Sequence, residues 1–568
     1  MTDLDRVQIS PTESADQVFT NEFNTYLLAA HDKFTTNVHK IRVMRQKLIE
    51  KANKEGILPT FPPKSDINSG EWKIPSIPDE LRKPGIEISG PISIPNMAIN
   101  ALNPGPEGER AEGYLDDDED SGGHRLVDTI SASQVRLQAT EGTLTFFNKE
   151  RGRKYEVKEG ALPFFMHRER GLHLDEPDVK IDGKPIPATI LSTCLTLFYG
   201  GRAQIKRGQG VYFYLPKMEV VEEARFYKEF FDFTKDYLNL PNNTVIKAIP
   251  LVESLPIVYI MDEILDALGP YAGGLNAARW DLKASILEYV MADKNRVWPD
   301  RFGVDIKTTD FMANIFRRLV AICLRRGAVP IGGMATALPS RDDEINTVAA
   351  ASIKSDKEWE ANQGFIRAWV AHIFHMKAAA DPFKDLHKSG WQPTSHMLNP
   401  SNFPVEIKAP DGPITMEGTH RNCRMVIEYV EGWLNGRGAK GIDSLEGKPG
   451  IHPALMEDLA TGRISVAQLA QRIIHNVKTS DTGKEHNLDV VKNALDVELK
   501  DILSIRRLQG QKEDNISKEL QDLQIERYHQ AFKISLRWIK NYTEFNFRSL
   551  GSYSRPELIE MTRQPDAF

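Results

Sequence analysis

The sequence predicts an α/β protein built around a barrel of eight parallel strands, with further helical sequence before and after the barrel. Between residue 86 and about residue 373, short apolar segments alternate with amphipathic segments of helical period, the pattern of repeated βα units. Eight such apolar segments occur, the number that a (β/α)8 barrel requires. A doubly wound open sheet is the alternative, but it typically has fewer strands, and no G-x-G-x-x-G follows the first segment.

Residues 1–85 precede the barrel and are expected to form a helix and an irregular arm. Residues 20–55 carry apolar side chains at helical spacing, and Gly56 follows them as a stop signal. Residues 57–85 are rich in proline, glycine and aspartate, which indicates irregular chain leading into a new unit.

The barrel domain is expected over residues 86–405. Its predicted strands, in chain order, are IEISGPI, EGYLDD, LPFFMHR, GVYFYLP, TVIKAIPLV, AGGLNAA, AVPIGGM and IRAWVAH. Near residues 139–160 a period-two alternation around a Gly/Arg turn interrupts the rhythm, so we expect a hairpin insertion there. Residues 406–568 have only helical periodicity, as in ISVAQLAQRIIHNVK, and are expected to form a C-terminal α-helical domain.

Composition limits the class of protein. The chain has 568 residues, of which 41% are hydrophobic and 27% charged, and it lacks an apolar run of the roughly 20 residues that cross a bilayer. A net charge of −7 argues against nucleic-acid binding. Three widely separated cysteines favour a reducing compartment, and the chain carries neither a signal peptide nor a Ser-Lys-Leu-type ending. We therefore expect a cytoplasmic protein that binds neither nucleic acid nor membrane.

Charged residues follow several of the predicted strands, where barrel enzymes carry their catalytic groups. Glu253 follows the fifth strand and Asp281 the sixth, while the second strand runs into the acidic stretch 116–123. Carboxylates on adjacent strands provide the oxygen ligands that Mg²⁺ prefers. Arg170, after the third strand, has the planar guanidinium that suits an anionic substrate bound at such a metal.

Each of these signals also has a structural interpretation. A single acid at a strand end is often a helix N-cap or a loop charge, and an acidic run is usually a solvated loop. His173 and His372 are typical of structural hydrogen-bonding residues, and close packing explains the glycines of residues 332–334 as well as a phosphate cradle does. The functional interpretation depends on the combination, because four strand ends converge on one chemistry.

From about residue 20 to residue 510 the chain resembles the malate synthases, specifically the shorter isoform type. The matching motifs include RGLHL, YFYLPKME, VESLP, GLNAARWD, RRGAVPIGGMATALPSRDD, NCRMVIEYVEGWL and LMEDLATGRIS. The resemblance implies a TIM barrel with an N-terminal helical clasp and a C-terminal helical domain. It also implies an acyltransferase of the glyoxylate cycle, linked to the tricarboxylic acid cycle. Such an enzyme condenses acetyl-CoA with glyoxylate in a Mg²⁺-dependent Claisen reaction and hydrolyses the product to malate and CoA.

The same resemblance assigns roles to residues of this chain by motif match. Glu253 and Asp281 correspond to the Mg²⁺ ligands, Arg170 to the catalytic arginine and Asp458 to the catalytic aspartate of the C-terminal domain. The expected substrate-binding residues are Arg170, Glu253, Trp280 and Asp281, and the expected supporting acids near the metal are Glu119 and Asp120.

Some positions depart from the family pattern and bear on substrate identity. They are Leu172, Leu282-Lys283 after RWD, Arg367-Ala368 before Trp369, Ile373 after His372, and the segment 442–453 before LMED, which is longer than is typical of the family. These departures leave open a divergent paralogue that condenses another acyl-CoA or 2-oxo acid. A catalytically silent interaction protein is a further alternative, but a silent fold has no reason to keep all four proposed metal and catalytic residues together.

Overall fold

The computed structural model describes residues 3–149, 152–442, 454–512 and 518–563. The chain divides into two compact units, each assembled from separate parts of the sequence. The first unit comprises Met1–Lys47, Pro59–Arg279 and Asn314–Pro404. The second comprises Leu48–Leu58, Trp280–Ala313 and Val405–Phe568. The three domains expected from the sequence have other boundaries and stay a prediction.

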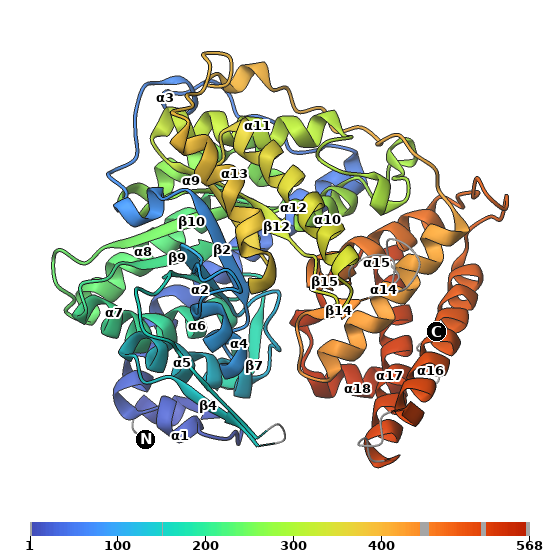
Figure 1. The fold of residues 1–568 in the computed structure, drawn as a ribbon, viewed down its shortest axis with the longest axis horizontal. Coiled ribbons are helices and arrows are strands. Elements are labelled where there is room, and N and C mark those ends of the chain that lie inside the picture. Colours follow the sequence, from blue (N-terminus) through green and yellow to red (C-terminus); the bar gives the residue numbers. More distant parts are fainter. Residues whose placement is uncertain (1–2, 150–151, 443–453, 513–517, 564–568) are drawn as a thin grey trace. The chain divides into compact units, whose positions relative to one another are not determined.

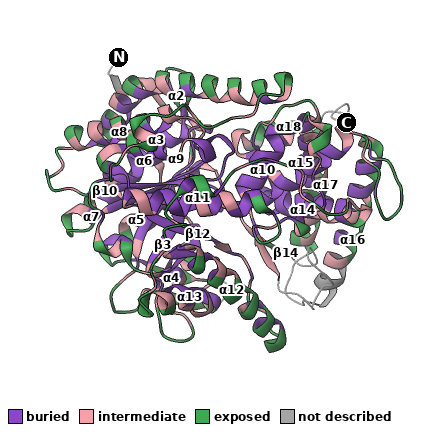
Figure 2. Cartoon of the chain, turned by 90° about the horizontal axis from the view of Figure 1, so that it is seen from above, coloured by how far each residue is buried: buried purple, intermediate pink, exposed green. Residues whose placement is uncertain are grey.

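A closed barrel of eight parallel strands forms the centre of the first unit, which confirms the predicted fold class (Figure 1). In the order of their pairing, the strands are β2 (Gly85–Gly90), β3 (Gly113–Asp117), β6 (Phe164–Arg168), β9 (Val211–Leu215), β10 (Ile246–Val252), β11 (Gly274–Ala277), β12 (Val329–Ala335) and β13 (Arg367–Val370). The barrel closes where β13 pairs with β2, and Arg367 lies opposite Gly85. The strands are buried along most or all of their length, so they occur in the sequence as apolar runs and not as alternating patterns (Figure 2).

Helices follow the strands and cover the barrel. The longer helices of this part of the chain are α4 (Pro95–Leu102), α5 (Leu126–Glu141), α6 (Ala188–Thr196), α8 (Val221–Tyr237), α9 (Met261–Leu268), α11 (Asp310–Arg326), α12 (Asp343–Gln363) and α13 (Met376–Lys388). The shorter elements include α1 (Ala15–Val18), α3 (Asp66–Ser69) and α7 (Arg202–Lys206). β4 (Thr145–Asn148) and β5 (Arg153–Glu156) form an antiparallel hairpin within the predicted insertion, and residues 150–151 between them lie outside the described residues.

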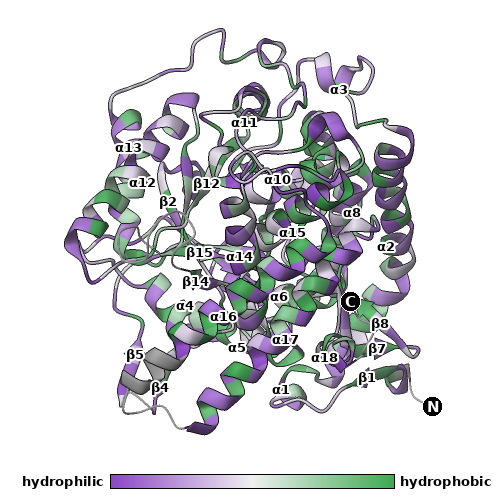
Figure 3. Ribbon diagram, turned by 90° about the vertical axis from the view of Figure 1, so that its right-hand side faces the viewer, coloured by the Kyte–Doolittle hydropathy of each residue, from purple (hydrophilic) through white to green (hydrophobic). Residues whose placement is uncertain are grey.

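The N-terminal helix α2 (Asn21–Glu55) packs on the barrel helix α8 through a narrow aromatic face. Phe34 contacts Phe226 and Phe230 with ring centroids 5.6 and 5.0 Å apart. The Tyr26 hydroxyl lies 2.7 Å from the Thr234 hydroxyl. The rest of α2 is mostly hydrophilic (Figure 3). A three-stranded sheet of β1 (Val7–Ile9), β7 (Asp175–Ile181) and β8 (Lys184–Pro187) lies in the same unit.

The second unit is mainly helical. Its main helices are α10 (Arg279–Tyr289, which begins at the end of the first unit), α14 (Met416–Leu434), α15 (Leu459–Ile474), α16 (Leu488–Lys512), α17 (Lys518–Thr543) and α18 (Arg555–Arg563). The short strands β14 (Lys440–Ile442) and β15 (Leu455–Glu457) pair just before α15 begins. α15 is buried along most of its length, and Gly462 permits a close approach, because a Cβ there would lie 3.2 Å from Tyr429.

Two further properties of the fold bear on its chemistry. All three cysteines, Cys194, Cys323 and Cys423, are fully buried. Burial raises the pKa of each thiol above its usual value. Among the described helices, none combines the length and the apolar character needed to cross a membrane.

Candidate active site

The loop after β3 carries buried acids and is held in shape by Asp117. The Asp117 carboxylate accepts the backbone N–H groups of Glu119 at 2.9 Å and Ser121 at 3.0 Å, and the Ser121 hydroxyl at 2.6 Å. These bonds turn the loop back towards the strand that it leaves. Glu119 and Asp120 are each 1% exposed. The acidic run is therefore a buried, hydrogen-bonded loop at the carboxyl end of the barrel, and not the solvated loop that its composition alone suggests.

Arg168 occupies the end of β6 and joins this loop. β6 pairs with β3 so that Arg168 lies opposite Asp117, and the guanidinium donates to the two Asp117 carboxylate oxygens at 2.8 and 2.6 Å. The same guanidinium lies 3.3 Å from the Asp120 carboxylate and 5.5 Å from the ring centre of Trp369. A two-pronged bond of this kind fixes orientation as well as charge.

Lys217 brings a second cation into the cluster from the chain after β9. Its Nζ lies 3.1 Å from Glu119, 3.0 Å from Asp120 and 3.5 Å from Glu253. Its backbone N–H donates to Glu253 Oε1 at 2.6 Å. Lys217 has a φ of 55°, a left-handed conformation that is unusual for a residue other than glycine. Backbone strain of this kind is most often found at functional sites.

The surroundings shift the pKa values of two acids of the cluster in opposite directions. Burial, reinforced by the neighbouring Asp120, raises the pKa of Glu119 well above its usual value. Burial opposes ionisation of Asp120 too, but Lys217 and Arg168 outweigh it and lower the pKa of Asp120. Neighbouring charges therefore decide the sign of the shift at Asp120, and burial decides it at Glu119.

The donor set of the cluster fits a hard divalent cation. Asp120 and Glu253 offer carboxylate oxygens within 4.8 Å of each other, and both residues are buried. Glu119 Oε1 is buried and accepts no hydrogen bond from any described residue. Mg²⁺ is held by one or two protein carboxylates together with waters and substrate oxygens, so these oxygens suit it.

Asp281 follows the neighbouring strand. β11 pairs with β10 so that Ala277 lies opposite Val252, the residue before Glu253. Asp281 comes four residues after Ala277 and lies in the first turn of α10, where it is 3% exposed. Lys283 of the same helix lies over the Trp280 ring at 4.4 Å and donates to the backbone oxygen of Val304.

Asp458 begins the helix α15. Its carboxylate Oδ1 accepts the backbone N–H of Ala460 at 3.1 Å, and its own N–H donates to Thr461 Oγ1 at 3.1 Å. This reciprocal cap holds Asp458 at the start of α15, a helix that is buried along most of its length. Its side chain is only partly buried.

Two family models match the chain, namely the malate synthase TIM barrel domain over residues 164–402 and the malate synthase C-terminal domain over residues 413–546. Malate synthase A of Escherichia coli is 34% identical over 504 residues, which are 87% of this chain and 89% of that protein. The malate synthase of Myxococcus xanthus is 34% identical over 80% of this chain and 81% of that protein. The glyoxysomal malate synthase of Candida tropicalis is 30% identical over 86% of each.

The chain belongs to the malate synthase family. It is therefore an enzyme, since its relatives are acyltransferases named malate synthase. The family supports the interpretation of the barrel mouth as an active site. The roles of single residues are argued below from their surroundings.

The two arginines of the RERG stretch have different surroundings. Arg168 lies in the acid cluster, whereas the Arg170 guanidinium lies 2.9 Å from the Glu176 carboxylate of β7. Arg168 was not among the site residues expected from the sequence. Lys217 was missed as well, because the YFYLPKME motif that contains it shows neither its backbone conformation nor its partners.

Two positions that the sequence left open, Arg367 and Gly332, have structural explanations. Arg367 is fully buried at the amino end of β13, where it bonds Glu87 at 2.7 Å and the backbone oxygen of Lys83 at 2.7 Å. That end of the barrel is opposite the acid cluster. Gly332 has no room for a side chain, because a Cβ there would lie 2.3 Å from Glu360. Packing therefore explains this glycine of the GGM stretch.

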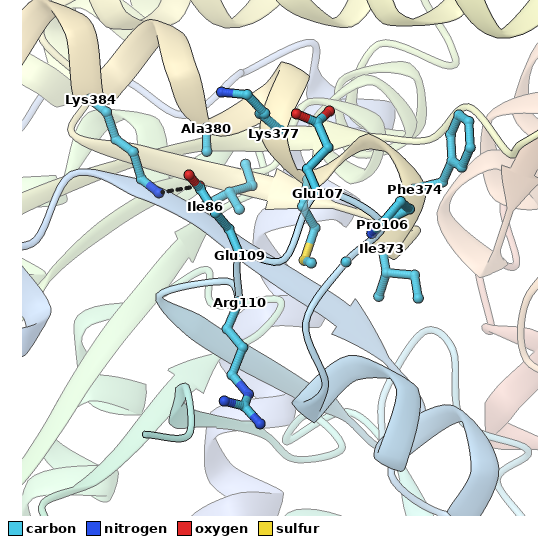
Figure 4. Close-up of a pocket in the computed structure, with 12 residues that line it drawn as sticks. Ile86, Pro106, Glu107, Glu109, Arg110, Ile373, Phe374, Lys377, Ala380 and Lys384 are labelled. Atoms are coloured by element: carbon cyan, nitrogen blue, oxygen red, sulfur yellow. Dashed lines mark hydrogen bonds and ion pairs between the residues drawn. The ribbon is translucent and has the colours of Figure 1, made fainter. Parts of the chain in front are cut away.

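A surface pocket of the first unit is lined by none of the residues of the acid cluster. It lies between α13 and the loop before β3, and Glu109 and Lys384 face each other in it at 3.3 Å (Figure 4).

Proposed function

We propose that the chain condenses acetyl-CoA with glyoxylate and hydrolyses the resulting thioester to malate and CoA, with Mg²⁺ held by Glu253 and Asp281. The observation that supports this most directly is the buried set of carboxylates at the carboxyl ends of the strands, in a chain of the malate synthase family. Asp120 is a third candidate ligand because its carboxylate lies beside that of Glu253. Bound Mg²⁺ would act as a Lewis acid on the glyoxylate carbonyl.

The residues of α10 are suited to orient glyoxylate. Trp280 and Asp281 lie in the first turn of α10, and the start of a helix carries a partial positive charge from its aligned backbone dipoles. A carboxylate is stabilised at such a helix start. We therefore assign the glyoxylate carboxylate to the backbone of Trp280 and Asp281.

Asp458 is proposed as the base. The acetyl methyl group of acetyl-CoA is a weak acid, so a positioned carboxylate must take its proton as the new carbon–carbon bond forms to the glyoxylate aldehyde carbon. A base of this kind typically contributes about 10²–10⁴-fold to the rate. Water then cleaves the carbon–sulfur bond of the thioester and releases malate and CoA.

The enolate oxygen that develops during proton removal needs a cation. We propose Arg168 for this role, because Asp117 and Trp369 hold its guanidinium at the carboxyl end of the barrel. The motif match assigns the same role to Arg170, and the Glu176 pair of Arg170 is the observation against it. Glu119 and Asp120 lie beside this guanidinium and are proposed as the supporting acids near the metal.

An assay of CoA release tests the proposal. Purified full-length protein is supplied with acetyl-CoA and glyoxylate, with and without Mg²⁺, and in parallel with propionyl-CoA and pyruvate. We expect Mg²⁺-dependent release with the first pair, lost in Glu253→Gln and retained in Glu406→Gln, a change at an exposed residue. Turnover of only another pair would establish a divergent paralogue. Release with none of the pairs would overturn the proposed reaction of this chain.

A further inference from the structure

Arg463 makes two buried ion pairs within the second unit, one of them to Asp281. Its Nη1 lies 2.8 Å from Asp281 Oδ1, and its Nη2 lies 2.8 Å from Glu288 Oε2. Arg463 belongs to α15, while Asp281 and Glu288 are seven residues apart on α10 and therefore lie two turns apart on one face of that helix. A single guanidinium thus joins the two helices.

Glu288 is itself held in place. Its carboxylate accepts the Tyr542 hydroxyl at 2.7 Å and receives further bonds from Arg463 Nη2 and Nε at 2.9 and 3.3 Å. Asn53 donates to the backbone oxygen of Glu288 at 3.0 Å. Glu288 therefore binds Nε and Nη2 of the Arg463 guanidinium, and Nη1 of the same group contacts Asp281.

The position of Arg463 along α15 gives this contact a second consequence. Asp458 caps the start of the same helix, five residues earlier. α15 is buried and continuous between the two positions. A group that ties α15 to the first turn of α10 therefore ties the proposed base to the proposed metal ligand.

We propose that Arg463 is a positioning residue that fixes Asp281 in the orientation for Mg²⁺ and sets its distance from Asp458. The proposal rests on the proposed function, since it needs Asp281 to be a metal ligand. Groups that hydrogen-bond a metal-ligating side chain commonly change metal affinity 10–100-fold when they are removed. Arg463 holds one oxygen of Asp281, so it selects which oxygen faces the ion.

Orientation and charge predict opposite results for removal of Arg463. If orientation dominates, as proposed, loss of the guanidinium lets the Asp281 carboxylate leave the orientation that the ion needs, and Mg²⁺ binds more weakly. If simple repulsion between the guanidinium and the ion dominated, its removal would tighten Mg²⁺ binding. The sign of the change therefore separates the two mechanisms.

The test is calorimetric titration of full-length protein with Mg²⁺ alone, on wild type, Arg463→Gln, Arg463→Lys and Arg472→Gln. Arg472 is the matched control, because it is a fully buried arginine of the same helix, pairs with Asp300 at 2.6 Å and contacts neither Asp281 nor Glu288 among the described residues. Urea unfolding of each variant measures the purely structural effect.

We expect the dissociation constant for Mg²⁺ to rise about tenfold or more in Arg463→Gln, to rise less in Arg463→Lys, and to stay unchanged in Arg472→Gln. An equal change in Arg463→Gln and Arg472→Gln, or tighter binding by Arg463→Gln, would overturn the proposal. If Arg463→Gln does not fold, the comparison of Arg463→Lys with Arg472→Gln decides. Absence of Mg²⁺ binding in wild type would instead overturn the metal site of the proposed function, which distinguishes the two failures.

Discussion

Asp458 accepts the backbone N–H of Ala460 at 3.1 Å, so the residue proposed as the base is also the N-cap of the buried helix α15. One carboxylate therefore has a structural and a chemical part to play. Asparagine caps helices as well as aspartate does, but it cannot accept a proton. The pair of substitutions at this position separates the two parts.

Asp458→Asn is expected to keep the free energy of unfolding of wild type and to lose about 10²–10⁴-fold in kcat. Asp458→Ala should lose the same activity and in addition about 1 kcal/mol of stability, because the cap is removed. Steady-state kinetics together with denaturant unfolding check both. Activity of Asp458→Asn within a few-fold of wild type would show that another group removes the methyl proton.

Arg168→Lys and Arg170→Lys should have unequal effects. Lysine keeps the charge of Arg168 but loses the two-pronged bond to Asp117, so we expect kcat to fall by roughly 10²-fold, as for loss of one oxyanion donor. Arg170→Lys should retain most of its activity, since Arg170 pairs with Glu176. The reverse order of the two kcat values would restore the motif-based assignment to Arg170.

Lys217→Met should make stability depend on Mg²⁺. Removing the ammonium leaves Glu119, Asp120 and Glu253 buried without it, a loss of about 3–5 kcal/mol. Added Mg²⁺ should then raise the melting temperature of Lys217→Met more than that of wild type, measured by calorimetry. Lys357→Met is the control, because Lys357 is equally buried and pairs with Glu360. Equal responses of both variants to Mg²⁺ would contradict the placement of the cation.

Arg367→Met should destabilise the barrel without changing substrate choice. Arg367 forms a fully buried pair with Glu87, so breaking it is expected to cost about 3–5 kcal/mol. The ratio of kcat/KM for acetyl-CoA to that for propionyl-CoA should stay that of wild type. A changed ratio would mean that this departure from the family pattern does reach the substrate.

Glu169 should give stability a dependence on pH. Burial raises its pKa to about 7, although Arg136 acts in the opposite direction. Because the folded state holds the proton more tightly than the unfolded chain, this residue lowers stability as the pH rises from about 4.5 to 7. Glu169→Gln removes the part of this loss of stability that Glu169 causes. The free energy of unfolding of the variant, measured in urea, should therefore increase relative to that of wild type between pH 5 and pH 8. A constant difference across this range would contradict the shift.

The barrel could be predicted because each of its strands is a short buried run bounded by turns or helices. The strand ends also indicated Glu253 and Asp281, since a charge directly after an apolar run is visible in one dimension. The contact of Arg168 with the acid cluster was harder to predict from the sequence. The choice between Arg168 and Arg170 depends on where β6 ends and on the register of β6 with Asp117 of β3. The position of Lys217 in the acid cluster depends on its left-handed backbone conformation, which the sequence does not predict for a lysine.

The sequence also did not show which residues belong to the second, helical unit. Apolar periodicity indicates that helices follow residue 406, but not that residues 280–313 belong to the same compact unit. α10 follows the barrel strand β11 in the sequence, but its residues Asp281 and Glu288 pair with Arg463 of α15. Contacts between residues about 180 positions apart, such as Asp281 and Arg463, are set by tertiary packing and leave no local pattern.

The burial of Cys194, Cys323 and Cys423 has a consequence for an enzyme that would release a free thiol at every turnover. Exchange between a thiol and a disulfide requires an exposed thiolate. All three thiols are fully buried and have raised pKa values, so none is available to oxidised CoA. The folded chain is accordingly resistant to mixed-disulfide formation between these cysteines and the CoA that it would release.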